Sequence, residues 1–291
     1  MAENIETDVT VVGAGPVGLT LALDLASRGV TVTLLEARYP GEPPSVKCNH
    51  VAARSMELFR RLGVAGAIRA AGLPDDYPHD VAFRTTMTGR EVTRIPIPSR
   101  HDRATAPVGP DAGWPTPEPP HRINQLYLEP ILFAHAQAAS GVTIRNRVAF
   151  QHFTQDDAGV TVTARSLDSG EEVRVTSRYL VGCDGGRSPV RHQLGARFLG
   201  DAVVQRVQST YLRAPTLLSR LTTRPAWGNI SLNPRRSGTV YAIDGCERWL
   251  VHNYLRSDEA DFNAVDRDWA IRTILGVGPD FTYETISKED W

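Results

Sequence analysis

Residues 8–18 read Asp-Val-Thr-Val-Val-Gly-Ala-Gly-Pro-Val-Gly, and this stretch decides the fold. Its β-branched start, residues 8–12, is typical of a short buried strand. A G-x-G-x-x-G turn follows at once and opens residues 16–28, which have the pattern of a helix ending before a glycine. Residues 30–35 have the composition of a second buried strand. The sequence therefore predicts a β-α-β unit with a glycine-rich first turn.

Each residue of this turn suits the binding of a dinucleotide. Gly13 permits the tight turn, Gly15 lets a pyrophosphate approach the backbone, and Gly18 lets helix and strand pack closely. Pro16 and Val17 begin the helix, whose N–H groups and dipole favour phosphate. The alternative is a turn that uses glycine for its shape alone.

An acidic residue, Glu36, closes the second strand and argues against that alternative. Its carboxylate can accept hydrogen bonds from ribose hydroxyls and would repel a 2′-phosphate, so the pattern disfavours NADP at this site. Ala37 and Arg38 follow it and complete this part of the candidate site. The fingerprint alone leaves both FAD and NAD open.

A second motif, residues 179–191, reads Tyr-Leu-Val-Gly-Cys-Asp-Gly-Gly-Arg-Ser-Pro-Val-Arg. It predicts a buried strand, an acidic turn and a helix capped by Ser188. Asp184 and Gly185 would then lie at the carboxyl end of a strand, where open α/β sheets bind ligands. Taken alone, these residues are explained equally well by a capped helix.

Together these motifs resemble the class A flavoprotein monooxygenases, the p-hydroxybenzoate hydroxylase-like aromatic hydroxylases. Residues 13–18 with Glu36 resemble their FAD ADP-binding motif. Residues 184–191 resemble their second motif, which touches FAD and is implicated in the use of NAD(P)H. Residues 51–60 resemble the helix after their first β-α-β unit.

A further stretch, residues 121–129, resembles the family's R-x-x-Q-x-x-x-E motif, which implies that Arg122 and Gln125 lie near the flavin. The sequence departs from the family where Pro-Arg-Ala is usual, because Lys47 keeps the charge without the planar fork of arginine. The family's third motif, a Gly-Asp turn that holds the ribityl chain, has no counterpart before Trp291. We therefore expect a truncated flavoprotein that is poorly active by itself.

The resemblance implies an α/β fold with two domains. A Rossmann-like FAD-binding domain with a β-meander is expected over residues 1–72 and 122–195, incomplete at its C-terminus. A mostly β, α+β substrate domain is expected over residues 73–121 and 196–291, inserted into the first domain and following it. Ten prolines in residues 73–121 mark the inserted part.

The implied activity is that of an FAD-dependent monooxygenase. NADPH or NADH would reduce FAD, and the reduced flavin would use O2 to hydroxylate a phenolic or polyketide-like aromatic substrate. The alternatives are an epoxidase, halogenase or reductase on the same scaffold, or an inactive FAD-binding fragment. No tryptophan lies in the W-x-W-x-I-P stretch of flavin halogenases.

Catalytic side chains are not assigned from the sequence. A base that deprotonates a phenol could come from the second domain, and a ring pocket could be lined by its aromatic residues. The candidate bases are Tyr211, Tyr241, His252 and Tyr254, and the candidate ring-lining residues are Trp114, Trp227, Tyr241 and Trp249. Such residues are more often ordinary sheet or core residues.

Composition bounds the remaining possibilities. The 291 residues carry a net charge of −1, which gives no reason to expect nucleic acid or an anionic membrane as a partner. The three cysteines are far apart in sequence, and the histidines show no metal-ligand spacing, so we expect no metal and a cytoplasmic location. A homodimer stays open.

The remaining pattern predicts these further elements: helices over 50–62, capped by Asn49, and over 126–139, with Pro130 in the first turn; strands over 81–84 and 91–95; a meander of 142–145, 148–154, 160–165 and 172–177; and strands over 179–183, 203–212, 239–243 and 249–254.

Overall fold

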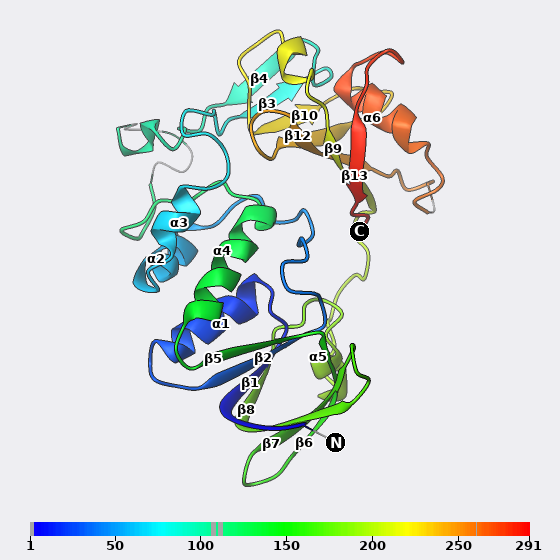
Figure 1. The fold of residues 1–291 in the computed structure, drawn as a ribbon. Helices are drawn as coiled ribbons and strands as arrows, with labels where there is room; N and C mark the ends of the chain where they lie inside the picture. The colour runs from blue at the N-terminus through cyan, green and yellow to red at the C-terminus, as the bar shows by residue number, and fades with distance from the viewer. Residues whose placement is uncertain (1–2, 106–108, 110–112, 260) are drawn as a thin grey trace. The chain divides into compact units, whose positions relative to one another are not determined.

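The computed structural model describes residues 3–105, 109, 113–259 and 261–291. The chain divides into two compact units (Figure 1). The first unit comprises Met1–Pro44, Leu58–Ile68 and Gln125–Gly200, and the second comprises Ser45–Glu57, Arg69–Asn124 and Asp201–Trp291. In the described part of the chain, no helix is long and apolar enough to cross a lipid bilayer.

The first unit is built on a six-stranded sheet with the strand order β5-β2-β1-β8-β7-β6. Its four mutually parallel strands are β1 (Glu3–Val12), β2 (Val32–Glu36), β5 (Val142–Asn146) and β8 (Glu172–Gly182). Two helices, α1 (Pro16–Ala26) and α4 (Gln125–Ala138), lie side by side against β2 and β5 (Figure 1). The predicted Rossmann-like β-α-β unit is confirmed.

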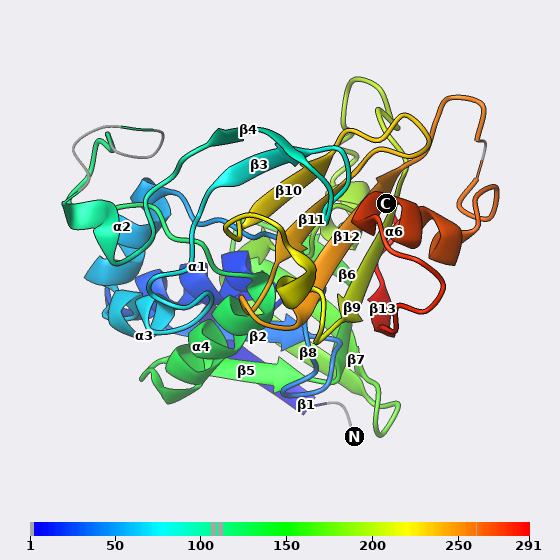
Figure 2. The ribbon, with the colours of Figure 1, turned by 90° about the horizontal axis from the view of Figure 1, so that it is seen from above.

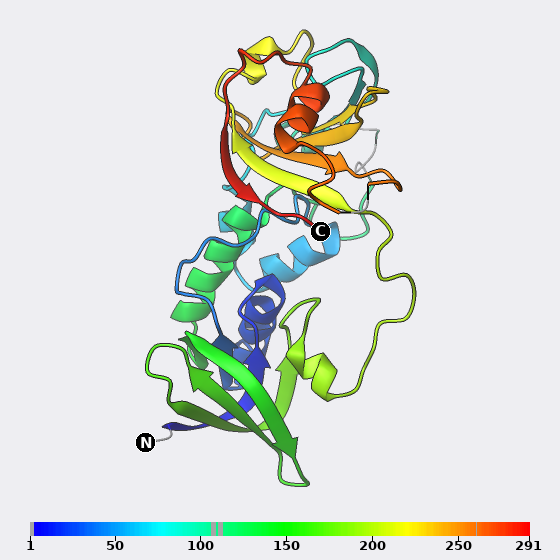
Figure 3. The same cartoon turned by 90° about the vertical axis from the view of Figure 1, so that its right-hand side faces the viewer.

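The antiparallel part of this sheet differs from the predicted meander. It consists of β6 (Val148–Gln155), β7 (Val160–Ser166) and β8, drawn in green in Figure 3. Residues 142–145 are not part of it, because β5 pairs in parallel with β2. Residues 172–177 and 179–183 do not form two strands, because β1 pairs along the whole of β8 and keeps it continuous.

Two of the predicted helices differ from the structure in where their first turn lies. Helix α2 (Ala53–Arg61) starts four residues after Asn49, because Val51 is held extended in a β-bridge with His121. Pro130 lies in the second turn of α4 rather than in the first. The helix continues through it, and Leu132 on the next turn is fully buried. A short helix, α3 (Ala65–Arg69), was not predicted.

The second unit is built on a seven-stranded sheet with the order β13-β9-β12-β11-β10-β3-β4 (Figure 2). Its strands are β3 (Val81–Arg84), β4 (Glu91–Ile95), β9 (Val207–Arg213), β10 (Gly228–Ser231), β11 (Gly238–Ala242), β12 (Arg248–Tyr254) and β13 (Glu284–Lys288). All pairs are antiparallel except β10 with β3. The mostly β character of this part of the chain is confirmed.

One face of the second sheet packs on helix α6 (Arg267–Leu275). Trp249 and Val251 of β12 join Ile271 and Ile274 of α6 in one buried cluster. Because side chains alternate along a strand, the residues between them on β12 point to the other face. Strands β10 and β13 and helix α6 were not predicted.

The two compact units divide the chain at other places than the predicted domains. Residues 45–57, 69–72 and 122–124 belong to the second unit, and residues 196–200 belong to the first. The bridge between Val51 and His121 and the hydrogen bond between Asn49 and Asn124 tie residues 45–57 to the second unit. The assignment of the units to cofactor and substrate stays a prediction.

Candidate functional site

The two predicted motifs lie next to each other at the carboxyl ends of β1 and β8. Val12 and Gly182 are paired residues at the ends of these parallel strands. Gly13 follows with a φ of +101°, and a Cβ on it would lie 2.5 Å from the carbonyl oxygen of Cys183. Only glycine fits there, because both the dihedral angle and the space exclude a side chain.

The glycines of the first turn have different surroundings. A Cβ on Gly18 would lie 1.9 Å from the carbonyl oxygen of Gly13, so this glycine lets α1 approach the strand end. Gly15 is the N-cap of α1 in extended conformation, and a Cβ on it would meet no described atom within 4 Å. Pro16 is the first helical residue, and Val17 after it is 69% exposed. The helix therefore begins at an open edge.

Glu36 ends β2 and is almost fully buried, with 8% exposure. Its carboxylate accepts a hydrogen bond from the Ala14 N–H at 2.9 Å, which ties it to the glycine turn. It also accepts from the backbone N–H of Arg38 at 3.0 Å and from the Arg38 guanidinium at 3.1 and 3.2 Å. Burial would raise the pKa of Glu36, but the bonds from Arg38 and Ala14 outweigh it and lower the pKa.

Arg38 bridges two buried carboxylates. Its Nη1 lies 2.8 Å from Glu129 of α4, and Glu129 also accepts from the Gln125 amide at 2.8 Å. Burial by itself would lower the pKa of Arg38, but the hydrogen bonds and ion pairs with Glu36 and Glu129 outweigh it. The pKa of Arg38 is therefore raised, and the guanidinium keeps its charge. The Gln and Glu of the R-x-x-Q-x-x-x-E stretch thus reach the fingerprint acid through Arg38. Sequence reasoning did not assign Glu129 to the site.

A cavity of about 280 Å3 opens beside this ion-pair chain. Its described lining consists of Ala14, Glu36, Arg38, Tyr39, Gly41, Glu42, Pro43, Pro44, Leu126, Glu129, Pro130, Phe133 and Asn146. Ala37 is exposed, and its carbonyl accepts from Arg147 at 3.4 Å. The cavity combines apolar walls with a few charged groups, which is the usual composition of a small-molecule site.

The second turn holds an incompletely bonded carboxylate. Asp184 accepts from the Val190 N–H at 3.1 Å through Oδ2, while its Oδ1 is buried and has no hydrogen-bond partner in the described structure. Gly185 follows with a φ of +82° and open space where a Cβ would point. Ser188 caps the next helix, α5 (Pro189–Gln193), by accepting from the Arg191 N–H at 2.9 Å. The predicted cap is confirmed.

Two of the predicted site residues, Lys47 and Arg122, belong to the second unit. Lys47 is exposed. Arg122 is 8% exposed, and its guanidinium lies 4.1 Å from the centroid of the Trp227 ring. Such a cation–π contact orients the planar cation and the indole together.

The face of the second sheet opposite α6 carries a row of aromatic rings. The ring centroids of Trp227 and Tyr241 are 5.0 Å apart, those of Tyr241 and His252 5.6 Å, and those of His252 and Tyr254 6.4 Å. Thr239 lies 3.0 Å from the Tyr254 hydroxyl. Burial lowers the pKa of His252 to about 4, so the ring is neutral at pH 7.

The other aromatic candidates lie elsewhere. Trp249 is fully buried in the cluster against α6, so it is a core residue and not part of this row. Tyr211 is 3% exposed, and its hydroxyl accepts from Arg248 at 3.2 Å. Trp114 lines a separate cavity of the second unit.

Comparison with known proteins agrees with this geometry. The family model described as "FAD binding domain" matches residues 6–272. A putative polyketide hydroxylase of Streptomyces halstedii is 32% identical over 97% of this chain and 50% of its own length. The aklavinone 12-hydroxylase RdmE of Streptomyces purpurascens is 40% identical over 65% of this chain and 35% of its own length.

Solved structures show the same likeness. The substrate-free form of the rebeccamycin biosynthetic enzyme RebC superposes with a TM-score of 0.86 at 35% identity, over 99% of this chain and 54% of RebC. The aklavinone-11 hydroxylase in complex with FAD and aklavinone gives 0.82 at 28% identity, over 99% of this chain and 53% of that one. The chain spans about half the length of these relatives or less. It belongs to the FAD binding domain family and, within it, to the class A FAD-dependent aromatic hydroxylases.

Proposed function

We propose that this protein is an FAD-dependent monooxygenase that hydroxylates a phenolic or polyketide-like aromatic substrate. The observation that carries the proposal is the pair of glycine turns, at Gly13 and Asp184, at adjacent strand ends. The names of the relatives, among them polyketide and aklavinone hydroxylases, support the substrate class.

The residues of the first unit fit the ADP half of FAD. The space beside Gly15 is open, so a phosphate can approach the backbone there. Helix α1 begins at this point without a side-chain cap. The first N–H groups of a helix are donors without intrahelical partners, so they suit the pyrophosphate. The buried Oδ1 of Asp184, which has no described partner, is an acceptor that a hydroxyl of the cofactor would satisfy.

Glu36 would hold the ribose, and Arg38 with Glu129 would hold Glu36 in position. Because four donor contacts already reach the Glu36 carboxylate, its orientation is set before any ligand binds. Lys47, Arg122, Gln125 and Gly185 are proposed to contact the remainder of the cofactor, as the family resemblance implies. When bound, reduced FAD supplies the activation of O2, with NADH or NADPH as the reductant.

The aromatic row of Trp227, Tyr241, His252 and Tyr254 is proposed to hold the substrate ring. Aromatic side chains bury large flat surfaces, and the hydroxyls of Tyr241 and Tyr254 can bond to substrate oxygens. His252 is neutral at pH 7 and can exchange a hydrogen bond with a phenol without adding charge. We place this chemistry in the cytoplasm.

The test measures FAD binding by flavin fluorescence, and hydroxylation of a phenolic polyketide by mass spectrometry under 18O2. The proposal expects FAD binding and one 18O atom in the product. Failure of the protein to bind FAD would refute the proposal. If the protein binds FAD but halogenates, epoxidises or only reduces its substrate, the proposed reaction is wrong and the proposed cofactor is right.

A further inference from the structure

A second cavity, of about 240 Å3, lies wholly within the second unit. Its described lining consists of Arg69, His79, Arg100, Arg103, Ala104, Trp114, Pro119, Pro120 and His121. Five of these side chains are basic, and none of the described lining residues is acidic. Among them, only Trp114 was considered above as a candidate for lining a ring pocket, so this basic cavity needs its own explanation.

His79 presents a fixed hydrogen-bond donor. It is 1% exposed, and its Nδ1 lies 3.2 Å from Nη2 of Arg103. A guanidinium has donors only, so Nδ1 must be the acceptor and the proton of a neutral ring must sit on Nε2. Burial, followed by the charges of Arg103, Arg122, His121 and Arg100, lowers the pKa of His79 to about 3. The ring therefore stays neutral, with an Nε2–H donor, throughout the physiological range.

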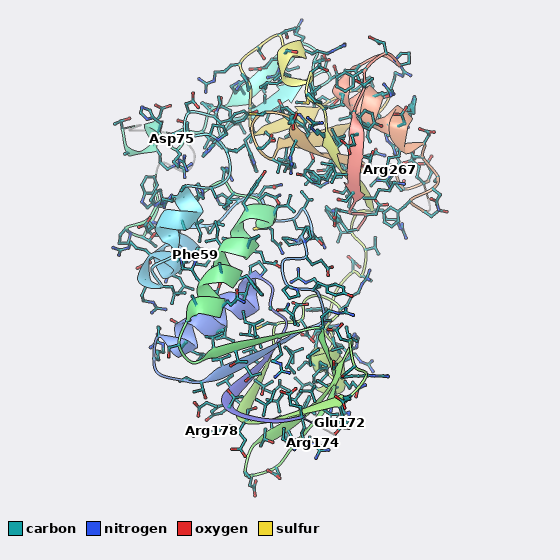
Figure 4. All side chains as sticks on the ribbon, viewed as in Figure 1. Phe59, Asp75, Glu172, Arg174, Arg178 and Arg267 are labelled. Atoms are coloured by element: carbon teal, nitrogen blue, oxygen red, sulfur yellow. The ribbon has the colours of Figure 1, made fainter. Side chains whose placement is uncertain are left out.

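Arg100 adds a cation with donors to spare. It pairs with Asp75, labelled in Figure 4, through Nε alone, and its two amino groups have no partner among the described residues. Arg69 bonds to Glu118 and to the Pro119 carbonyl through Nε and Nη2, which leaves its Nη1 without a described partner. Guanidinium N–H groups without a described partner bind a planar carboxylate more strongly than they bind a neutral group.

The rest of the lining is flat and apolar. Trp114, Pro119 and Pro120 supply ring surfaces, and Ala104 leaves space beside them. A volume of this size suits a ligand of about one ring rather than a drug-sized molecule.

We propose that this cavity binds a small aromatic carboxylate, with Arg100 and the Nε2–H of His79 bonding the carboxylate and Trp114 contacting the ring. Arg103 acts as a positioning residue, because it fixes the tautomer of His79. The inference does not rest on the proposed oxygenase reaction.

The test is calorimetric titration of the protein with benzoate, with benzamide as the uncharged analogue and inorganic phosphate as the anion without a ring. Benzoate should bind at least about tenfold more tightly than either, since it alone offers both charge and ring. Its affinity should fall as KCl is added. Equal affinity for benzoate and benzamide would overturn the charge argument, and equal affinity for benzoate and phosphate would overturn the aromatic argument.

A matched pair of variants locates the site. Arg100→Gln should weaken benzoate binding about tenfold or more and leave benzamide binding unchanged. Arg213→Gln is the control, because Arg213 also pairs through Nε, with Glu247 at 2.7 Å, but lies outside the cavity. The same loss in both variants would overturn the assignment.

The tautomer of His79 is tested without any ligand. Its ring nitrogens should show the Nε2–H form by 15N NMR, unchanged between pH 5 and 8. A Nδ1–H form, or titration near pH 6.5, would show that His79 is not the proposed donor. Because this measurement needs no substitution at His79, it remains decisive even if His79→Phe fails to fold.

Discussion

Alanine at Gly15 should weaken FAD binding strongly while leaving the fold intact, whereas alanine at Gly13 should destabilise the fold. Gly15 has φ −76° and ψ −177°, which any residue adopts, and its Cβ would meet no described atom within 4 Å. Alanine is less favourable than glycine as an N-cap but restricts the unfolded chain, and these effects oppose each other. We expect the free energy of unfolding to change by less than about 1 kcal/mol.

The same methyl group would occupy the open side where the pyrophosphate is proposed to approach. Losing one or two charge-assisted bonds from backbone N–H groups costs about 2–4 kcal/mol. That corresponds to FAD binding about 30- to 1000-fold weaker.

Gly13→Ala provides the structural contrast. Its φ is +101°, and its Cβ would lie 2.5 Å from the carbonyl oxygen of Cys183, so either the turn after β1 or the turn after β8 must move. We expect a loss of about 2–4 kcal/mol of stability, or roughly 5–15 °C in the unfolding temperature.

Thermal unfolding without cofactor and flavin fluorescence titration measure the two effects separately. If Gly15→Ala binds FAD as the unchanged protein does, the backbone at Gly15 does not contact the pyrophosphate. If Gly13→Ala unfolds at the original temperature, the packing of the two turns does not stabilise the sheet.

Three further outcomes are expected. Glu36→Ala should weaken FAD binding by about 1.5–3 kcal/mol in the same titration, whereas alanine at Glu247, a partly exposed ion-pair partner in the second unit, should leave it unchanged. The pKa values of His79 and His252 lie at about 3 and about 4, below the ordinary 6.5, so the unfolded chain binds more protons below pH 6.5. Stability should therefore be full above pH 6.5 and fall towards pH 4, by up to about 1.4 kcal/mol per pH unit for each histidine, and His252→Phe should flatten the curve of unfolding temperature against pH. Trp227→Leu should raise the KM for an aromatic substrate about three- to tenfold, and an unaltered KM would remove Trp227 from the substrate contacts.

Local signals explain what could be predicted from the sequence. Gly13, Gly18 and Glu36 could be predicted from their spacing, because each of them meets a steric or charge requirement of one turn. The strands β3 and β4 were predicted with their observed ends, because short stretches with β-branched or aromatic residues lie there between turn residues.

Long-range pairing explains what could not be predicted. The continuity of β8 comes from β1, whose Glu3 pairs with Val173 far along the chain. Strand β10 has only four residues, beginning Gly-Asn, and its own pattern is too weak to indicate a strand. The ion pair of Arg38 with Glu129 joins two segments that only the folded sheet and α4 bring together. The R-x-x-Q-x-x-x-E stretch contains Glu129, but its sequence gives no sign that Arg38 is the partner of this carboxylate.

The parallel pair of β3 and β10 has a consequence for how the protein is made. Strand β4 ends at Ile95, and β10 starts at Gly228, so the hairpin of β3 and β4 leaves the ribosome long before its neighbour exists. At about 5–20 residues per second, the wait is on the order of 10 s. During that time the edge of β3 has unpaired N–H and C=O groups, which makes it a template for wrong pairing. We therefore expect this hairpin to be the region of the nascent chain most dependent on chaperones.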